Sequence, residues 1–155
     1  MTYSFVRRRK ESLNAPGDPK PSTKIYSCSL EVRGYELDSF GHVNHGVYVS
    51  YLEHARWKML EEEGITIKNF NAWGMWPVII GIESHYFKPT FMGDLLEIRT
   101  QVVHHDRASF TFEQNIYRGD AHIVKAQVRS VMVDKQGRLV RRPDEINRLW
   151  ENLQP

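Results

Sequence analysis

The sequence predicts an α+β fold in which an antiparallel sheet of about five strands wraps around one long central α-helix. Three observations support this prediction. Residues 44–63 carry apolar side chains at helical spacing, several later segments alternate between apolar and polar side chains, and short turns join those segments. A sheet with one apolar face needs an element to cover it, and the single long helix is the element available.

The first strand and the helix come early in the chain. The strand is expected from Tyr26 to Arg33, because apolar and polar side chains alternate there with a period of two. The helix is expected from about Asn44 to about Glu63, with Asn44 as its N-cap and Gly64 as its stop signal. Its apolar side chains cover much of its circumference, as in a helix that the rest of the fold encloses.

The rest of the chain is mostly strand. Alternating or apolar segments predict four further strands, at 77–87, 96–102, 110–116 and 124–132. The motifs YRGD (117–120) and DKQG (134–137) predict turns, and such short connections imply antiparallel neighbours. A closing helix is expected from Asp144 to Leu153. A sheet wrapped around one helix is the hot-dog fold, whereas the competing ferredoxin-like fold would need a second long helix between strands.

The 155 residues are enough for one domain, which we expect at residues 25–155 behind a basic, proline-containing N-terminal extension at residues 1–24. This extension has six basic and two acidic residues, but it has one short arginine run and no interleaved aromatic residues, so we expect no nucleic-acid partner. No apolar run is long enough for a membrane span. We expect a cytoplasmic protein, and an organellar location stays open.

The motif DSFGHVNHGVY (38–48) lies between the first strand and the helix. Asp38 precedes the helix by a few residues, so its carboxylate can lie near the unpaired N–H groups of the first helical turn. A carboxylate beside unpaired donors can act as a base or nucleophile next to an oxyanion site. The alternative is that Asp38 is only a capping or surface residue.

Histidines in and after this motif also raise the question of a metal site. His42, His45 and His54 are the candidate ligands. However, His45 and His54 are nine residues apart, which does not match the i, i+4 spacing of helical metal pairs, and neither a cysteine nor a carboxylate completes a recognisable set. We therefore expect no metal and no cofactor.

The segment YELDSFGHVNHGVYVSYLEHAR (35–56) resembles the signature of the 4-hydroxybenzoyl-CoA thioesterase class of hot-dog proteins. Its first part is also similar to plant acyl-lipid thioesterases of the methylketone pathway. FKPTFMGDLLEI (87–98) resembles the second landmark of the class, and the likeness runs from about Tyr26 to about Pro143. The resemblance implies hydrolysis of an acyl thioester carried on coenzyme A or acyl carrier protein, by a homo-oligomer that is a dimer or a tetramer.

The resemblance also implies roles for residues of the turn. Asp38 falls on the catalytic aspartate of the class, which would act as nucleophile or general base. His45 falls on the position whose backbone N–H polarises the thioester carbonyl, and its side chain could also donate to the oxyanion or to the leaving sulfur. Gly46 and Asn44 complete the predicted oxyanion and substrate-binding residues, although Asn44 is better placed as a helix cap than as a catalyst.

Two groups of residues beyond the turn have predicted roles as well. Glu53 and Arg56 fall on the acidic and basic helix residues of the class, and we expect a structural pair at an oligomer interface. Trp73, Met75 and Trp76 follow the helix and are candidates for an acyl pocket, with core packing as the alternative.

The sequence leaves two other functions open. A hot-dog hydratase or dehydratase would need an acidic residue paired with a histidine across the pocket, together with a hydratase motif that this sequence does not resemble. A non-catalytic module that binds acyl thioesters would lack the carboxylate, so Asp38 argues against it.

Overall fold

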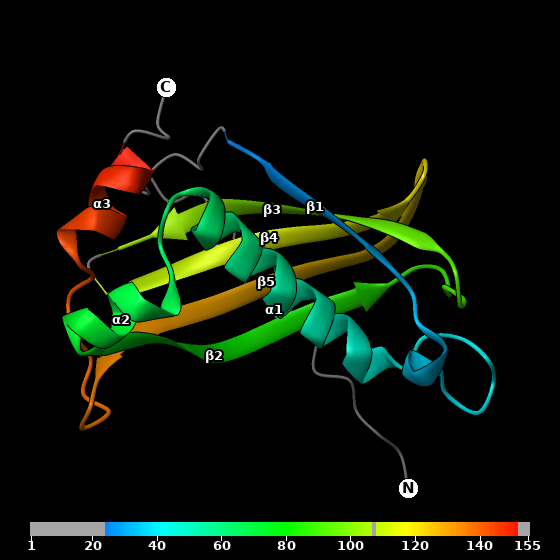
Figure 1. Cartoon of the computed structure of the whole chain (residues 1–155), viewed down its shortest axis with the longest axis horizontal. Helices are drawn as coiled ribbons and strands as arrows, with labels where there is room; N and C mark the ends of the chain where they lie inside the picture. The colour runs from blue at the N-terminus through cyan, green and yellow to red at the C-terminus, as the bar shows by residue number, and fades with distance from the viewer. Residues whose placement is uncertain (1–23, 107, 152–155) are drawn as a thin grey trace, which may run out of the picture.

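The computed structural model describes residues 24–106 and 108–151. Five antiparallel strands form one sheet in the order β1-β3-β4-β5-β2 (Figure 1). The strands are β1 (Tyr26–Glu31), β2 (Met75–Tyr86), β3 (Leu95–His105), β4 (Ser109–Arg118) and β5 (Ala121–Asp134). The helices are the 3-10 helix η1 (Gly34–Glu36), then α1 (His45–Glu62), α2 (Ile67–Trp73) and α3 (Asp144–Glu151).

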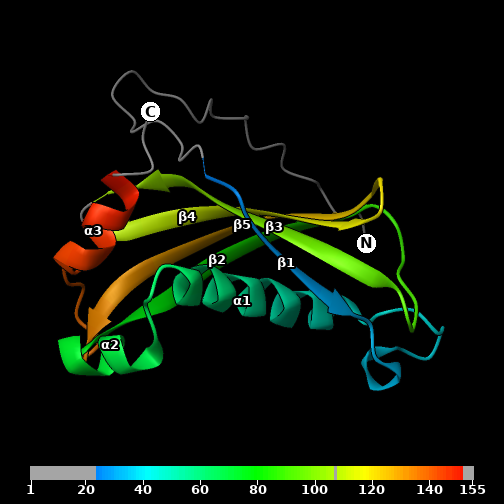
Figure 2. The same ribbon diagram turned by 45° about the horizontal axis from the view of Figure 1, so that its top comes forward.

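Helix α1 runs along the inner face of the curved sheet (Figure 2). Its buried apolar side chains are Tyr48, Tyr51, Leu52, Ala55, Met59 and Leu60. They pack into a core whose fully buried sheet residues include Leu96, Ile98, Ile116 and Val124. The predicted hot-dog arrangement, with about five antiparallel strands around one long helix, is confirmed.

The ends of α1 agree with the sequence prediction. The Asn44 side chain accepts a hydrogen bond from the Gly46 N–H, so Asn44 is the N-cap. Glu63 is the C-cap, and Gly64 follows it with a φ of 74°. Because this left-handed conformation suits glycine, Gly64 ends the helix without strain.

The strands after the helix also follow their sequence pattern. β4 alternates strictly, and its core-facing side chains are Phe110, Phe112, Gln114 and Ile116. The turn between β4 and β5 contains Gly119, with a φ of 55°, and the turn after β5 contains Gly137, with a φ of 75°. Both turns lie where the YRGD and DKQG motifs predict them.

Two short helices were not predicted. α2 has seven residues, too few for a clear periodic pattern, and it forms because Thr66 and Asn69 cap its start and Gly74 ends it with a φ of 67°. Phe70 of α2 is buried between the rings of Trp57 and Trp73. The second unpredicted helix is η1. The chain turns into it after Glu31, so β1 ends earlier than expected.

The predictions for the two ends of the chain fall partly outside the described residues. α3 begins at Asp144, as predicted, and the predicted end at Leu153 lies outside the described residues. The predicted N-terminal extension lies outside them too, except for Lys24, which pairs with Glu62 and Glu63 at the end of α1. In the part of the chain that the structure describes, none of the helices is long and apolar enough to cross a membrane.

Candidate active site

Asp38 lies in a tight turn between η1 and α1. Its backbone N–H donates to the His42 carbonyl at 2.8 Å, and its own carbonyl accepts the Gly41 N–H at 3.1 Å. Gly41 has a φ of 82°, which favours glycine. The carboxylate is also held, because Asp38 Oδ1 accepts the Phe40 N–H at 2.8 Å. The local sequence therefore fixes both the backbone and the side chain of Asp38.

The surroundings of Asp38 favour its ionised form. The hydrogen bond from the Phe40 N–H is the largest cause that holds the pKa of this carboxyl below its ordinary value, and His42 adds to the effect. His42 Nδ1 lies 3.4 Å from Asp38 Oδ2. From the sequence, His42 was a candidate metal ligand only, and its contact with Asp38 was not predicted. The four-residue spacing within a glycine-containing turn is the signal that could have revealed it.

The first turn of α1 lies beside this carboxylate. Asn44 Oδ1 accepts the Gly46 N–H at 2.9 Å, so one of the predicted oxyanion donors is already paired. The His45 backbone N–H has no acceptor among the described residues. A Cβ atom at position 46 would lie 3.3 Å from Asn44 Oδ1, so glycine leaves room for the cap. The free donor at the start of this helix therefore belongs to His45.

A cavity of about 310 Å³ brings these groups together. Its lining residues come from the turn, from α1 and from the segment after β2: Asp38, His42, Val43, His45, Tyr48, Tyr86, Phe87, Lys88 and Pro89. The Tyr86 hydroxyl donates to the His45 carbonyl at 3.3 Å and so ties the end of β2 to the start of α1. The predicted residues Asp38 and His45 thus share one cavity, and Asn44 and Gly46 adjoin it.

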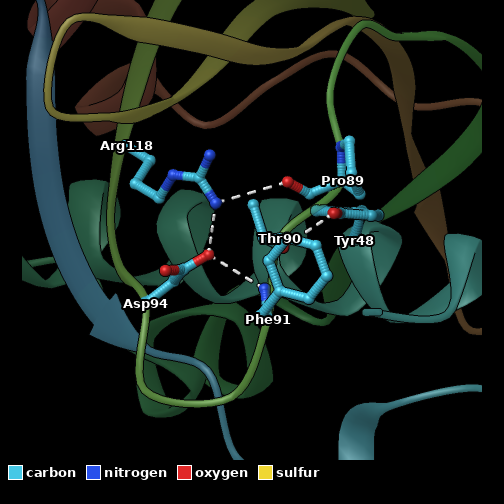
Figure 3. A network of polar contacts seen from close by, with 6 residues as sticks. All are labelled: Tyr48, Pro89, Thr90, Phe91, Asp94 and Arg118. Atoms are coloured by element: carbon cyan, nitrogen blue, oxygen red, sulfur yellow. Dashed lines mark hydrogen bonds and ion pairs between the residues drawn. The ribbon is translucent and has the colours of Figure 1, made fainter. Parts of the chain in front are cut away.

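A network of polar contacts holds the loop between β2 and β3 against this cavity (Figure 3). The Tyr48 and Thr90 hydroxyls are 2.8 Å apart, and Thr90 is fully buried. Asp94 accepts the Phe91 N–H at 2.9 Å and pairs with Arg118 of β4 at 2.6 Å. The loop that carries Lys88 and Pro89 is therefore anchored at both α1 and the sheet.

A buried carboxylate, that of Glu36, also stabilises the Asp38 turn. Glu36 is only 6% exposed, and it accepts hydrogen bonds from the Arg33 N–H at 2.8 Å and from the Tyr51 hydroxyl at 2.5 Å. The Glu36 carbonyl accepts the Asn44 N–H at 3.0 Å. Burial alone would raise the pKa of Glu36, but the hydrogen bonds from Arg33 and Tyr51 outweigh it and lower the pKa. Glu36 thus joins both ends of the Asp38 turn to α1.

The three predicted acyl-pocket residues lie away from the Asp38 cavity. Trp73, Met75 and Trp76 are partly buried and pack against the core cluster near α2. They do not line the Asp38 cavity, nor a second cavity of about 90 Å³ beneath the C-terminal half of α1. Their role in acyl binding stays a prediction.

Glu53 and Arg56, the predicted structural pair, line one cavity, and the Glu53 charge favours the charged form of Arg56. Arg56 is buried and donates to Gln114 Oε1 at 2.7 Å, and its nitrogen atoms and the Glu53 oxygens form no ion pair within 4 Å among the described residues. The role of the two residues at an oligomer interface stays a prediction. Within the described ranges, no three histidine, cysteine, aspartate or glutamate side chains are grouped so that they could hold a metal ion.

Comparison with known protein families shows to which superfamily the chain belongs. The model of the thioesterase-like superfamily matches residues 32–149. The chain belongs to this superfamily. The membership confirms the relationship that the 35–56 segment indicated, and the matched region contains the Asp38 turn, α1 and the whole cavity lining.

Individual members of the superfamily are related to the chain at moderate identity. A chloroplast acyl-acyl carrier protein thioesterase of Arabidopsis thaliana is 30% identical over 129 residues, which are 82% of this chain and 68% of that protein. The long-chain acyl-CoA thioesterase FadM of Escherichia coli is 37% identical over 73 residues, 47% of this chain and 54% of FadM. The crystal structure of a hypothetical protein from Aquifex aeolicus aligns with a TM-score of 0.77 at 28% identity, covering 81% of this chain and 98% of that one.

Proposed function

We propose that this member of the thioesterase-like superfamily hydrolyses acyl thioesters carried on coenzyme A or on acyl carrier protein. The observation that carries the proposal is the cavity in which the Asp38 carboxylate and the start of α1 meet. A carboxylate next to an unpaired helix N-terminal amide supplies both a reacting group and a donor for the developing oxyanion.

In the proposed reaction, the thioester carbonyl oxygen accepts the His45 N–H. Asp38 either attacks the carbonyl carbon to form an acyl anhydride, which water then hydrolyses, or removes a proton from a water molecule that attacks instead. In the first route the carbon–sulfur bond breaks and the thiolate leaves as the anhydride forms, and in the second route the thiolate leaves after water has attacked. The His45 side chain could protonate the leaving sulfur, and the Gly46 N–H joins the oxyanion site only if the Asn44 side chain releases it.

His42 has a supporting role in this proposal. Its Nδ1 atom lies within reach of Asp38 Oδ2, while Asp38 Oδ1 is occupied by the Phe40 N–H. His42 therefore orients the carboxylate and leaves the remaining lone pairs of Oδ2 for the substrate or for water.

We also propose that the chain acts as a homo-oligomer that pairs through β2. This strand lies at an edge of the sheet, and its apolar side chains are unusually exposed, with Val78 at 42% and Ile80 at 55%. A long apolar edge strand is a ready template for pairing with another strand. A second copy that pairs with β2 would bond its free backbone groups and place a neighbouring strand beside both side chains.

The test is thiol release from a panel of acyl-CoAs and acyl carrier proteins by the wild type and by Asp38→Asn. We expect the substitution to lower kcat/KM by at least about a hundredfold, because the amide keeps the shape but cannot act as base or nucleophile. Asp120→Asn is the matched control, since Asp120 lies in the exposed turn between β4 and β5.

Other outcomes would point to the competing functions. Equal rates in wild type and Asp38→Asn would contradict the role of Asp38. Tight binding of acyl thioesters without turnover by the wild type would identify a binding module. Addition of water to enoyl thioesters without thiol release would identify a hydratase.

A further inference from the structure

The second cavity, of about 90 Å³, has an unusual lining. Most of its wall is apolar or aromatic, with Trp57, Phe70, Phe110 and Phe112 among the lining residues. Arg56 lines it as well and is only 7% exposed. A guanidinium group among aromatic side chains loses hydration, and this loss destabilises the folded protein unless hydrogen bonds replace it.

Arg56 is fixed in position by a buried glutamine. Gln114 is fully buried, and its Nε2 donates to the Leu52 carbonyl and to Thr100 Oγ1, each at 2.9 Å. These two bonds orient the amide so that Oε1 accepts from Arg56 Nη1 at 2.7 Å. The Arg56 guanidinium also lies 6.0 Å from the centre of the Phe112 ring. Neither partner can turn away without losing a hydrogen bond.

Most of the hydrogen-bonding capacity of Arg56 remains unused. A guanidinium has five N–H donors, and among the described residues Arg56 makes a single hydrogen bond, to Gln114. Burial lowers the pKa of Arg56 to about 10, so the group still carries its charge at neutral pH. The cavity therefore offers charged donors in a largely apolar setting, in which Glu53 and Ser130 are the other polar lining residues. Among the described residues Glu53 attracts the Arg56 charge but forms no hydrogen bond with it, so an acceptor oxygen of a ligand would satisfy the remaining donors.

This cavity and the Asp38 cavity lie along the same two elements. Arg56 follows His45 by eleven residues on α1, which corresponds to about 16 Å along the helix axis. On β2, Tyr86 lines the Asp38 cavity and Ile79 lines the second one. Ile82 lies between them and shares the inner face of the sheet, because it pairs with the buried Val128. Since Ile82 is 40% exposed, an apolar side chain is accessible at this point of the inner face.

We propose that the second cavity binds the distal part of the acyl chain and that Arg56 donates there to an oxygen on that part of the chain. The preferred substrates would be acyl thioesters that carry a hydroxyl or oxo group far from the thioester. The inference rests on the proposed function, because it takes the acyl group to extend from Asp38 along β2.

Binding of free acids tests this inference separately from hydrolysis. The dissociation constants of medium- and long-chain fatty acids are measured by calorimetry for the wild type, beside the ω-hydroxy and the (ω−1)-oxo acids of the same length. We expect the oxygenated acid to bind at least about tenfold tighter at the length that reaches Arg56, since a hydrogen bond to a charged donor is worth that much. The hydroxy and oxo arms identify which oxygen the cavity prefers.

Arg56→Met should reduce this preference to about twofold or less. Because the substitution leaves Gln114 Oε1 without its partner, the double variant Arg56→Met/Gln114→Leu removes both polar groups and serves if the single variant does not fold. Arg141→Met is the matched control, since Arg141 is exposed and belongs to neither cavity, and it should keep the full preference.

Two results would overturn the inference: the wild type binds plain and oxygenated acids equally at every length, or the preference survives the loss of Arg56. Hydrolysis of plain acyl-CoAs alongside either result would leave the proposed function intact. Failure to hydrolyse any thioester would count against the proposed function, and the binding comparison would still decide on the cavity.

Discussion

The carboxylate of Asp38 is held by the turn that contains it, and this has a consequence for the pH dependence of the reaction. The proposed chemistry needs the ionised carboxylate. Since the Phe40 N–H holds the pKa of Asp38 below its ordinary value, the carboxylate stays ionised to lower pH than a free aspartate would. We expect the acidic limb of kcat/KM to lie below pH about 3.9. The full pH profile measures it, and a limb at or above that value would contradict this role of the turn.

Glu36 makes the stability of the protein pH-dependent. Because its pKa is lowered in the folded state, its contribution to stability is present above the unfolded pKa of about 4.3 and is lost as the pH falls through the folded pKa. We expect Glu36→Gln to reduce the free energy of unfolding by about 1–3 kcal/mol at pH 7. The difference should shrink as the pH falls below about 4.3. Urea denaturation at several pH values measures both quantities.

The control for Glu36 is Glu61→Gln. Glu61 is an exposed residue of α1 that pairs with Lys58 at the surface. Exposed pairs of this kind contribute about 0–1 kcal/mol, so this variant should follow the wild type at every pH. A loss of stability in Glu36→Gln that does not change with pH would mean that packing, rather than charge, accounts for the role of Glu36.

Single residues could be predicted from the sequence where neighbours in the chain are also neighbours in space. Asp38, Asn44 and His45 lie in one continuous motif, and the cap assigned to Asn44 is confirmed. Gln114 depends on partners far along the chain, and Glu36 depends on Tyr51, fifteen residues away, as well as on the nearby Arg33. The period-two pattern of β4 does put Gln114 on the core face, but its partner Arg56 comes from α1 and only the fold brings them together.

At the scale of elements, the start of α1 combines a structural and a proposed catalytic task. Asn44→Ala removes the side chain that accepts the Gly46 N–H, and we expect the free energy of unfolding to fall by about 1 kcal/mol. Asn44→Ser, which can still cap the helix, should recover most of this loss. Chemical denaturation of the three proteins measures it, and equal midpoints would mean that the cap does not stabilise α1.

Long elements with regular patterns were predicted well, and short ones were not. The eighteen residues of α1 repeat their apolar positions over many turns, whereas the seven residues of α2 span about two. The formation of α2 depends on Phe70 docking into the core beside Trp57, a contact between segments that sequence spacing does not reveal. The cavities escaped prediction for the same reason, because each is lined by several elements.

At the scale of the whole molecule, the free edge of β2 is where we expect a second copy to bind. Ile80→Lys places a charge on this edge and should convert the oligomer to a monomer. Sedimentation velocity measures the change in mass. Leu139→Lys is the control, because Leu139 is 67% exposed and lies outside β2. A wild type that sediments as a monomer would contradict the assembly.

The strand order also predicts when the active site forms during folding. β3, β4 and β5 are consecutive in both sequence and space, so this meander needs only short loops to close, whereas β1 and β2 join it at opposite edges. The Asp38 turn follows β1, and the loop with Thr90 follows β2. We therefore expect slow amide hydrogen exchange in β4 and late protection around Asp38, so that a newly made chain becomes an enzyme only in its last folding step.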